Sequence, residues 1–337
     1  MIRSGDMDRA FVEEVMTEPG GEHLITCWSC GTCAATCLVR RYEPAFNPRA
    51  ILHRAGLGLR DAVLSSGEIW QCSACDACYA RCPRGIHISD VMGALRNLAV
   101  RAGYEAPGAS AVSDETLCSG CAVCVRSCPY EAIERVALDG TDRMVAQVNP
   151  NLCQRCGVCV AACPTGAMSL ESTSDRELLT RMGAGGWLEG KGCLQGEATE
   201  PRVLAFVCQW SIHSDAEWSR LQELESDAVR IVNLPCSGRI RPEMLMLALS
   251  QGADGVLVVG CREDECHYKR GTYLGRGKLA LIQEMMDQMG LPRGRVRFAE
   301  AGAADRRVLP RLIADFSRDL AGLTSSATSA ATSTVQG

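Results

Sequence analysis

Sixteen of the 21 cysteines in this chain of 337 residues follow one spacing, C-x2-C-x2-C-x3-C, which occurs four times. The four copies are Cys27-Cys30-Cys33-Cys37, Cys72-Cys75-Cys78-Cys82, Cys118-Cys121-Cys124-Cys128 and Cys153-Cys156-Cys159-Cys163. In this spacing three thiolates on one tight loop bind three irons of a cubane cluster, and the fourth cysteine reaches across to a sister cluster. The runs therefore predict four [4Fe–4S] clusters and a protein that carries electrons.

Exchange of the fourth cysteine within each pair of runs defines the predicted ligand sets. They are Cys27, Cys30, Cys33 and Cys82; Cys72, Cys75, Cys78 and Cys37; Cys118, Cys121, Cys124 and Cys163; and Cys153, Cys156, Cys159 and Cys128. Zinc is the alternative metal. Zinc knuckles and ribbons separate two cysteine pairs by a long gap, which these runs lack, so iron is favoured. The first run departs from the others because Leu38, and not proline, follows its last cysteine.

The first two runs are predicted to lie in an all-helical domain, residues 1–105. Asn47 followed by Pro48 indicates a helix start, and Gly103 indicates a helix end. Apolar residues recur at helical spacing in two stretches, Ile51, Leu52, Leu59, Val63 and Leu64, and Val91, Met92, Leu95, Leu98 and Ala99. No segment of this domain predicts a strand.

The last two runs are predicted to lie in an α+β domain, residues 112–172. Both runs end in Cys-Pro, and Asp139-Gly140 between two candidate strands predicts a hairpin. A connector follows, residues 173–199. Ser174 and Glu177 have the spacing of a capping box, which predicts a short helix there.

Residues 200–322 alternate between strand and helix, which predicts a doubly wound α/β domain with a parallel sheet. The expected strands are Val203–Val207, Val229–Leu234, Val256–Val259 and Val296–Phe298. The expected helices are Glu243–Leu249, Leu279–Met289 and Val308–Phe316. Residues 323–337 are of low complexity and are predicted to be disordered.

Five cysteines lie outside the runs: Cys193, Cys208, Cys236, Cys261 and Cys266. Cys208, Cys236 and Cys261 each follow a predicted strand directly, and ligands of open α/β sheets bind at the carboxyl ends of strands. Together with Cys266 they suit a [2Fe–2S] cluster or zinc. The predicted redox clusters in the same chain favour [2Fe–2S]. His267 beside them is expected either to hydrogen-bond near the cluster or to lie on the surface. Cys193 fits no set.

Composition narrows the possible functions. A formal charge of −5, with further negative charge on loaded clusters, argues against a nucleic-acid partner. The chain has no apolar run of the roughly 20 residues that span a bilayer, so no direct membrane insertion is expected. It also shows no signal peptide, which favours the cytoplasm. The sequence shows no catalytic constellation and no convincing binding motif for a flavin or a nicotinamide.

Three resemblances to known families follow from these residues. Residues Cys27–Cys33 and Ile69–Cys75, with Asn47-Pro48-Arg49 and Cys82-Pro83-Arg84-Gly85, resemble the C subunit of heterodisulfide reductase. This resemblance implies an all-helical ferredoxin domain like that of succinate dehydrogenase iron–sulfur subunits. Residues 118–163 look like a two-cluster bacterial ferredoxin.

The C-terminal third resembles the delta subunit of methyl-viologen-reducing hydrogenase. The matching residues are Cys208-Gln209-Trp210, Cys236-Ser237-Gly238-Arg239, Gly260-Cys261 and Cys266-His267-Tyr268. The resemblance implies a [2Fe–2S] cluster and electron transfer to a flavoprotein like the A subunit of heterodisulfide reductase. Members often have further cysteines at the first motif, where this chain has Val207 and Ser211. Cys208 is then the only candidate ligand there.

The predicted function is an electron-transfer subunit of a heterodisulfide-reductase-like complex that carries out flavin-based electron bifurcation. Its expected partners are a flavoprotein like the A subunit of heterodisulfide reductase, a disulfide-reducing protein like the B subunit, and a hydrogenase or formate dehydrogenase as donor. Two other functions stay open. One is a link from a flavin dehydrogenase to a quinone through a separate membrane anchor, and the other is an iron–sulfur redox sensor.

Overall fold

The computed structural model describes residues 7–37, 39–40, 43–106, 110–170, 174–189, 200–212, 215–302 and 307–333. Its internal contacts divide the chain into two compact units. The first is Met1–Gly108 with Asn149–Gln154, and the second is Ala109–Val148 with Arg155–Gly337. Among the described residues, no helix is long and apolar enough to cross a membrane.

The first unit is built from helices, as the sequence predicts, and its described residues include no strand. The helices are α1 (Arg9–Thr17), α2 (Thr32–Thr36), α4 (Pro48–Gly56), α5 (Arg60–Leu64) and α6 (Ile88–Arg101). Asn47 caps α4 by accepting a hydrogen bond from the Ala50 N–H at 3.2 Å, and Pro48 occupies the first helical turn. Gly103 follows the end of α6 with a φ of 86°, so both predicted helix boundaries are confirmed.

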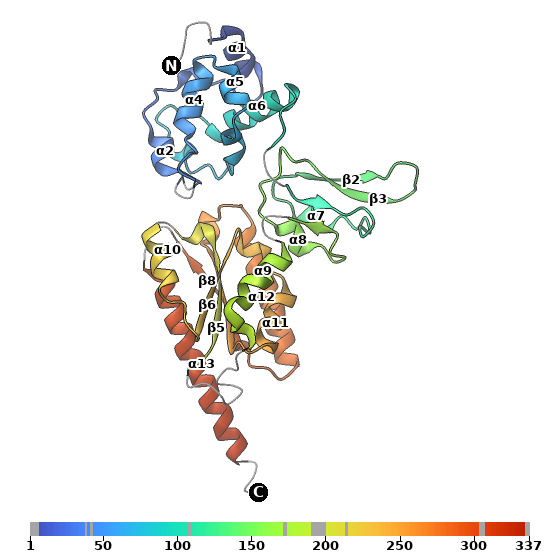
Figure 1. Cartoon of the computed structure of the whole chain (residues 1–337), viewed down its shortest axis with the longest axis vertical. Helices are drawn as coiled ribbons and strands as arrows, with labels where there is room; N and C mark the ends of the chain where they lie inside the picture. The colour runs from blue at the N-terminus through green and yellow to red at the C-terminus, as the bar shows by residue number, and fades with distance from the viewer. Residues whose placement is uncertain are drawn as a thin grey trace. The chain divides into compact units, whose positions relative to one another are not determined.

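Packing among α1, α4, α5 and α6 forms the core of this unit (Figure 1). The buried side chains include Phe11, Val15, Ile51, Leu52, Val91, Met92, Leu95 and Leu98. At the end of α1, Glu18 is only 9% exposed and accepts hydrogen bonds from Asn97 at 3.0 Å and from Arg101. The hydrogen bond from Arg101 lowers the pKa of Glu18, so this carboxylate is charged at neutral pH. It joins α1 to α6.

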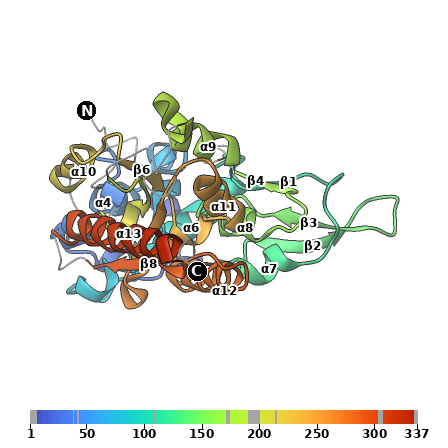
Figure 2. The ribbon, with the colours of Figure 1, turned by 90° about the horizontal axis from the view of Figure 1, so that it is seen from below.

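The second unit begins with a small fold of two short sheets and two helices (Figure 2). β1 (Val112–Ser113) pairs antiparallel with β4 (Met168–Ser169), and β2 (Ile133–Ala137) pairs antiparallel with β3 (Met144–Val148). Asp139-Gly140 lies between β2 and β3, which confirms the predicted hairpin. The helices α7 (Val123–Ser127) and α8 (Val158–Ala162) each carry the third cysteine of a run.

A four-stranded parallel sheet forms the rest of the second unit. Its strands are β5 (Val203–Cys208), β6 (Val229–Leu234), β7 (Gly255–Cys261) and β8 (Val296–Ala301). The strand order is β6-β5-β7-β8, so β5 has β6 on one side and β7 on the other. All four predicted strands are confirmed.

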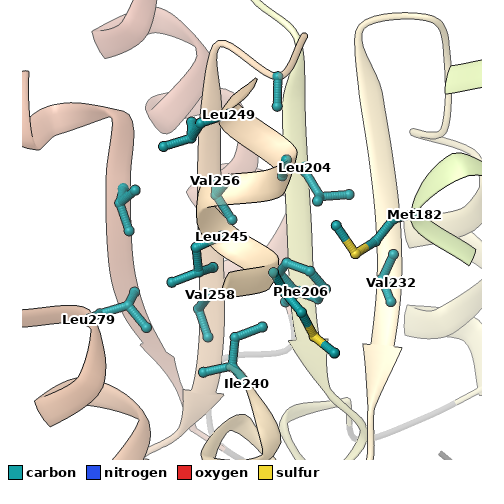
Figure 3. Packing of buried hydrophobic residues seen from close by; sticks show 14 of the residues in the cluster. Met182, Leu204, Phe206, Val232, Ile240, Leu245, Leu249, Val256, Val258 and Leu279 are labelled. Carbon is teal, nitrogen blue, oxygen red and sulfur yellow. The ribbon is translucent and has the colours of Figure 1, made fainter. Parts of the chain in front are cut away.

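Helices cover both faces of this sheet (Figure 1). On one face lie α9 (Asp175–Gly183), α11 (Pro242–Ser250) and α12 (Gly271–Gln288), and on the other lie α10 (Asp215–Gln222) and α13 (Val308–Ser333). Two apolar cores result. In the first, Leu204 and Phe206 of the sheet meet side chains of the helices and neighbouring strands (Figure 3). In the second, Leu257 and Val259 pack with Phe316 of α13.

Of the helices that pack on the parallel sheet, three differ from the sequence expectation. The sequence pattern predicts no helix at α10, whose eight residues are mostly polar. α12 begins at Gly271, eight residues before the predicted start, because no proline or strong cap interrupts the segment. α13 continues to Ser333, although the composition predicts disorder from residue 323. Ser174 does cap α9 as predicted, accepting from the Glu177 N–H at 3.2 Å.

Substitution Glu18→Gln should destabilise the first unit, because it replaces a charged acceptor that joins α1 to α6. Loss of a hydrogen bond to a charged group costs about 1–3 kcal/mol. We expect a lower midpoint of anaerobic thermal unfolding at pH 7 for the iron-loaded variant. Glu13→Gln, at an exposed position of the same helix, is the matched control and should leave the midpoint unchanged. Equal midpoints for the two variants would contradict this role of Glu18.

Candidate iron–sulfur centres

The four cysteine runs share one backbone conformation. In each run the residue before the second cysteine and the residue after it have left-handed φ angles. These residues are Ser29 and Gly31, Ala74 and Asp76, Gly120 and Ala122, and Arg155 and Gly157, with φ between 51° and 85°. For a non-glycine residue this conformation costs roughly 1–2 kcal/mol. The loops therefore keep the same left-handed conformation at these two positions, and it is strained wherever the residue is not glycine.

The fourth cysteine of each run also has a fixed conformation. Cys37, Cys82, Cys128 and Cys163 each cap a short helix or 3-10 turn in an extended conformation, with φ between −75° and −70°. In the last three runs a proline follows, and the second residue after that proline is again left-handed: Gly85, Glu131 and Gly166. The first run has no proline at this point, and Leu38 lies outside the described residues.

In the first unit, a cavity brings together cysteines from both runs. Cys27, Cys30 and Cys33 line it together with Cys82. Its wall also includes Arg49, Arg84 and Leu52, and it encloses about 360 Å³, part of it open to solvent. Three cysteines of one run and the last cysteine of the other thus share one space, as the exchange of the fourth ligand requires.

The second unit contains an equivalent cavity of about 350 Å³. It is lined by Cys118, Cys121 and Cys124 of the third run and by Cys163 of the fourth. Burial is the largest cause of the raised pKa of Cys124, and the negative charge of Cys163 adds to it, which indicates that the two sulfurs are close. In both types of fold, cysteines of two runs therefore line one cavity.

The remaining two predicted sets differ in how far the structure describes them. Cys37 lies near Cys72 and Cys75: burial raises its pKa to about 11, and the charges of those two thiolates contribute. For the fourth run, Cys153 falls in the segment that belongs to the first unit, whereas Cys156 and Cys159 are buried in the second. Joining Cys128 with Cys153, Cys156 and Cys159 stays a prediction.

The electrostatics of these loops fit a bound iron–sulfur cluster. Burial, followed by the charge of Cys27, raises the pKa of Cys33 to about 11, and burial with neighbouring thiolates raises the pKa of Cys78 further. Several buried thiolates therefore repel one another unless cations lie between them. Backbone N–H groups also point at the sulfurs, as from Ser29 to Cys27 at 3.3 Å and from Ile86 to Cys82 at 3.4 Å. Such hydrogen bonds are typical around cluster ligands.

Four of the five cysteines outside the runs meet at one edge of the parallel sheet. Cys208 is the last residue of β5 and Cys261 the last of β7, and their Sγ atoms are 3.8 Å apart. This is the point where the strand order reverses, the usual ligand position of such sheets. Cys236 follows β6, and its charge interacts with those of Cys208 and Cys266. The structure thus brings together all four predicted residues.

Backbone N–H groups lie near each of these four sulfurs. The N–H groups of Gly238 and Thr272 donate to Cys236 and Cys266, each at 3.4 Å. The backbone N–H groups of Trp210, Ser237 and Ser211 lie near Cys208, and that of His267 lies near Cys261. Four thiolates with N–H donors and mostly buried surroundings fit a [2Fe–2S] cluster, and the same donor set also suits zinc.

Gly271 is a residue of this site that sequence reasoning missed. A Cβ atom at this position would lie 2.1 Å from Cys236 Sγ and 3.7 Å from Cys266 Sγ. The first residue of α12 must therefore be glycine for both sulfurs to keep their places. Its only sequence signal is a glycine shortly after Cys266, which by itself is indistinguishable from an ordinary loop glycine.

His267 lies in an aromatic cluster and not on the surface, so the surface alternative is wrong. Its side chain is 2% exposed, and its ring stacks on Trp210 with 3.4 Å between ring centroids. Tyr268 packs edge-on against both rings. Burial lowers the pKa of His267 to about 3, so the ring is neutral. Cys193 lies outside the described residues.

Comparisons with known protein families match three separate stretches of the chain. Residues 203–324 match the family described as methyl-viologen-reducing hydrogenase, delta subunit. Residues 23–86 and 117–167 each match a 4Fe-4S dicluster domain. The two dicluster matches imply iron–sulfur clusters in the two parts of the chain that contain the cysteine runs.

Curated relatives fall into the same groups. The C subunit of the H(2):CoB-CoM heterodisulfide,ferredoxin reductase of Methanothermobacter thermautotrophicus is 36% identical over 138 residues, 41% of this chain and 74% of the relative. The D iron-sulfur subunit of the F420-non-reducing hydrogenase of Archaeoglobus profundus is 36% identical over 102 residues, 30% of this chain and 74% of the relative. This chain belongs to both families, joined in one polypeptide.

A third relative matches over a smaller share of its length. The A subunit of the ferredoxin:CoB-CoM heterodisulfide reductase of Methanosarcina mazei is 35% identical over 121 residues, 36% of this chain but only 15% of the relative. The fusion predicted from the cysteine motifs is thus confirmed. The chain is an iron–sulfur electron-transfer subunit related to subunits of oxidoreductase complexes.

Substitution Gly271→Ala should remove the metal of the C-terminal site, because the added methyl group collides with Cys236 Sγ. We expect the anaerobically purified variant to lose about two irons per chain if a [2Fe–2S] cluster is bound there. Gly277→Ala in the same helix is the matched control, since a Cβ there meets no atom within 4 Å. Full iron content and an unchanged visible spectrum for Gly271→Ala would contradict this close packing.

The exchange of fourth ligands can be tested with pairs of substitutions in the first unit. Cys82→Ala combined with Cys27→Ala affects one predicted cluster, so iron loss should equal that of Cys82→Ala alone, about four per chain. Cys82→Ala combined with Cys72→Ala affects two clusters and should lose about eight. Cys193→Ala is the control and should lose none. The reverse order of the two double variants would show that each run binds its own cluster.

Proposed function

We propose that this chain binds four [4Fe–4S] clusters and one [2Fe–2S] cluster and relays electrons between partner subunits. The observation that carries this proposal is the arrangement of the cysteines: two cavities are lined by crossed sets, and a distinct four-cysteine site lies at a sheet edge. Sixteen cysteines form the four predicted cubane sets, and Cys208, Cys236, Cys261 and Cys266 form the remaining set. The proposal keeps the domain bounds that the sequence predicts.

The protein's own contribution is to bind the clusters and set their potentials. When bound, the clusters accept and release single electrons. The thiolates hold them in place, the backbone N–H groups stabilise the negative charge on the sulfurs, and burial excludes water. Buried cationic side chains also stabilise this negative charge. Arg96 is an example, and it donates to the carbonyl groups of Ile69 and Cys72. No substrate is converted by these residues.

The relatives support a place for the chain in a flavin-based bifurcating complex. Two of them are named as the C and A subunits of heterodisulfide reductases, and another as a subunit of a hydrogenase. We propose that the C-terminal site exchanges electrons with a hydrogenase or formate dehydrogenase. The four cubane clusters then connect an FAD-containing flavoprotein of the A type with a disulfide-reducing partner of the B type. The complex is proposed to be cytoplasmic.

The proposal is tested by anaerobic purification of the tagged chain from its native cells. We expect about 18 irons per chain, from four cubanes and one [2Fe–2S] cluster, together with a flavoprotein that contains FAD. In a stepwise chemical reduction, the chain alone should take up about five electrons, because each cluster accepts one. The reduction potentials of the five clusters should form one continuous range.

Other outcomes would replace parts of this proposal. About 16 irons and one zinc per chain would overturn the [2Fe–2S] assignment. Co-purification with a membrane anchor and quinone would favour the quinone-linked alternative. Clusters whose reduction potentials lie far apart, in a chain that binds no flavoprotein, would favour a redox sensor. The variant Cys208→Ala serves as a control and should lose only the C-terminal metal.

A further inference from the structure

Arg239 is a fully buried arginine located three residues after Cys236. Its side chain is 0% exposed. It ends the 3-10 turn Ser237–Arg239, in which its N–H donates to the Cys236 carbonyl at 2.9 Å. An arginine keeps its charge in proteins, and a fully buried charge is rare without a specific role. Cluster binding by the cysteines alone assigns no role to this residue.

The side chain of Arg239 packs against the loop of the fourth cysteine run. A Cβ atom on Gly157, the neighbour of Cys156, would lie 2.4 Å from Arg239 Cδ and 3.2 Å from Nε. Gly157 has a left-handed φ of 75°, so two requirements select glycine here. Next to it, the side chain of Val158 lies so close to Gly238 that a Cβ on Gly238 would meet it at 3.0 Å. The Arg239 side chain thus lies between the Cys156 loop and the Cys236 loop.

Other contacts show that the ferredoxin-type fold lies against the sheet edge that carries the four cysteines. The charge of Cys156 contributes to the raised pKa of Cys236, after burial and after the charge of Cys208. Tyr130, two residues after Cys128, packs edge-on against Tyr268 with 6.4 Å between ring centroids. Lys269 lies over the Tyr130 ring at 5.4 Å. The ferredoxin-type fold and the sheet edge therefore meet through several side chains.

The Arg239 guanidinium is held in place from the side of α9. Its Nη2 donates to Asp175 Oδ1, and Arg241 donates to the other carboxylate oxygen at 2.7 Å. Lys278 donates to the carbonyl groups of Gly238 and Ile240, which flank Arg239, at 2.8 and 3.3 Å. A cluster with four thiolates carries negative charge, so a fixed cation that packs against the loops of two clusters attracts both.

We propose that Arg239 is a shared positioning residue for two clusters, the one at Cys208, Cys236, Cys261 and Cys266 and the one that includes Cys156 and Cys159. It fixes the two loops against each other, and its charge favours the reduced state of both clusters. This inference rests on the proposed function, since it requires both clusters to be present. The reduction potentials of the two clusters are then not set independently of each other.

Potentiometric titration of Arg239→Gln, followed by electron paramagnetic resonance, tests this role. The two cluster types have distinct signals, so their midpoint potentials can be followed separately. We expect the one-electron reduction constants of both clusters to fall about tenfold, equal to about 59 mV for each. Arg239→Lys, which keeps the charge, should restore most of both shifts.

Arg241→Gln is the matched control. Arg241 shares Asp175 with Arg239, but 21% of its side chain is exposed to solvent. Solvent screens its charge, so both midpoints should stay close to those of the unchanged protein. Asp175→Asn gives an independent measurement with the opposite sign, because it removes negative charge beside the guanidinium and should raise both midpoints.

The outcomes separate this inference from the proposed function. Unchanged midpoints in Arg239→Gln at full iron content would overturn the inference, as would a shift confined to the C-terminal cluster. If Arg239→Gln loses iron, Asp175→Asn decides, and unchanged midpoints there overturn the inference. A protein that lacks one of the two clusters before any substitution contradicts the proposed function instead.

Discussion

The structure depends on one electrostatic constraint: twenty thiols must be gathered in small groups inside a low-dielectric protein. Twenty cysteines lie among the described residues, and many of them are buried. Burial and mutual repulsion raise thiol pKa values, as at Cys33 and Cys37. A bound cluster supplies the cations that make such groups favourable, and backbone N–H groups supply the remaining stabilisation. The loops are shaped to aim those N–H groups at the sulfurs.

This constraint explains why one loop conformation recurs on two unlike scaffolds. The first unit supports its runs with helices, whereas the ferredoxin-type fold supports them with short helices and two-stranded sheets. In both, left-handed residues flank the second cysteine, even where the residue is Ala74, Ala122 or Arg155. Left-handed alanine is unfavourable by itself, so the conformation is imposed by what the loop must bind and not by local preference.

Much of the fold and site can be predicted from the sequence because the relevant signals are local. The cysteine spacing, the Asn47-Pro48 helix start, the hairpin at Asp139-Gly140 and the apolar strands are each encoded within a few residues. The strand-end positions of Cys208, Cys236 and Cys261 also suffice to predict that they meet, because parallel strands share an edge. The helix α10 is not predicted because its sequence lacks a clear apolar period.

The rest of the fold and the site depends on contacts between distant residues, which the spacing of residues in the sequence does not reveal. Gly271 matters because Cys236 approaches it from another loop, and Gly157 because Arg239 does. For His267, the stacking on Trp210 excludes the surface position, and neither ring nitrogen has a hydrogen-bond partner among the described residues.

The two types of site differ in what fixes their ligands. Cys208 and Cys261 end neighbouring strands, whose pairing runs from Val203 opposite Gly255 to Val207 opposite Val259. The hydrogen bonds and buried cores of that sheet hold these sulfurs in place. In the cysteine runs, by contrast, the ligands lie on strained loops, and the strain is offset only where the loop binds its cluster. The C-terminal site is therefore preorganised by the sheet, whereas the cubane loops depend on cluster binding for their shape.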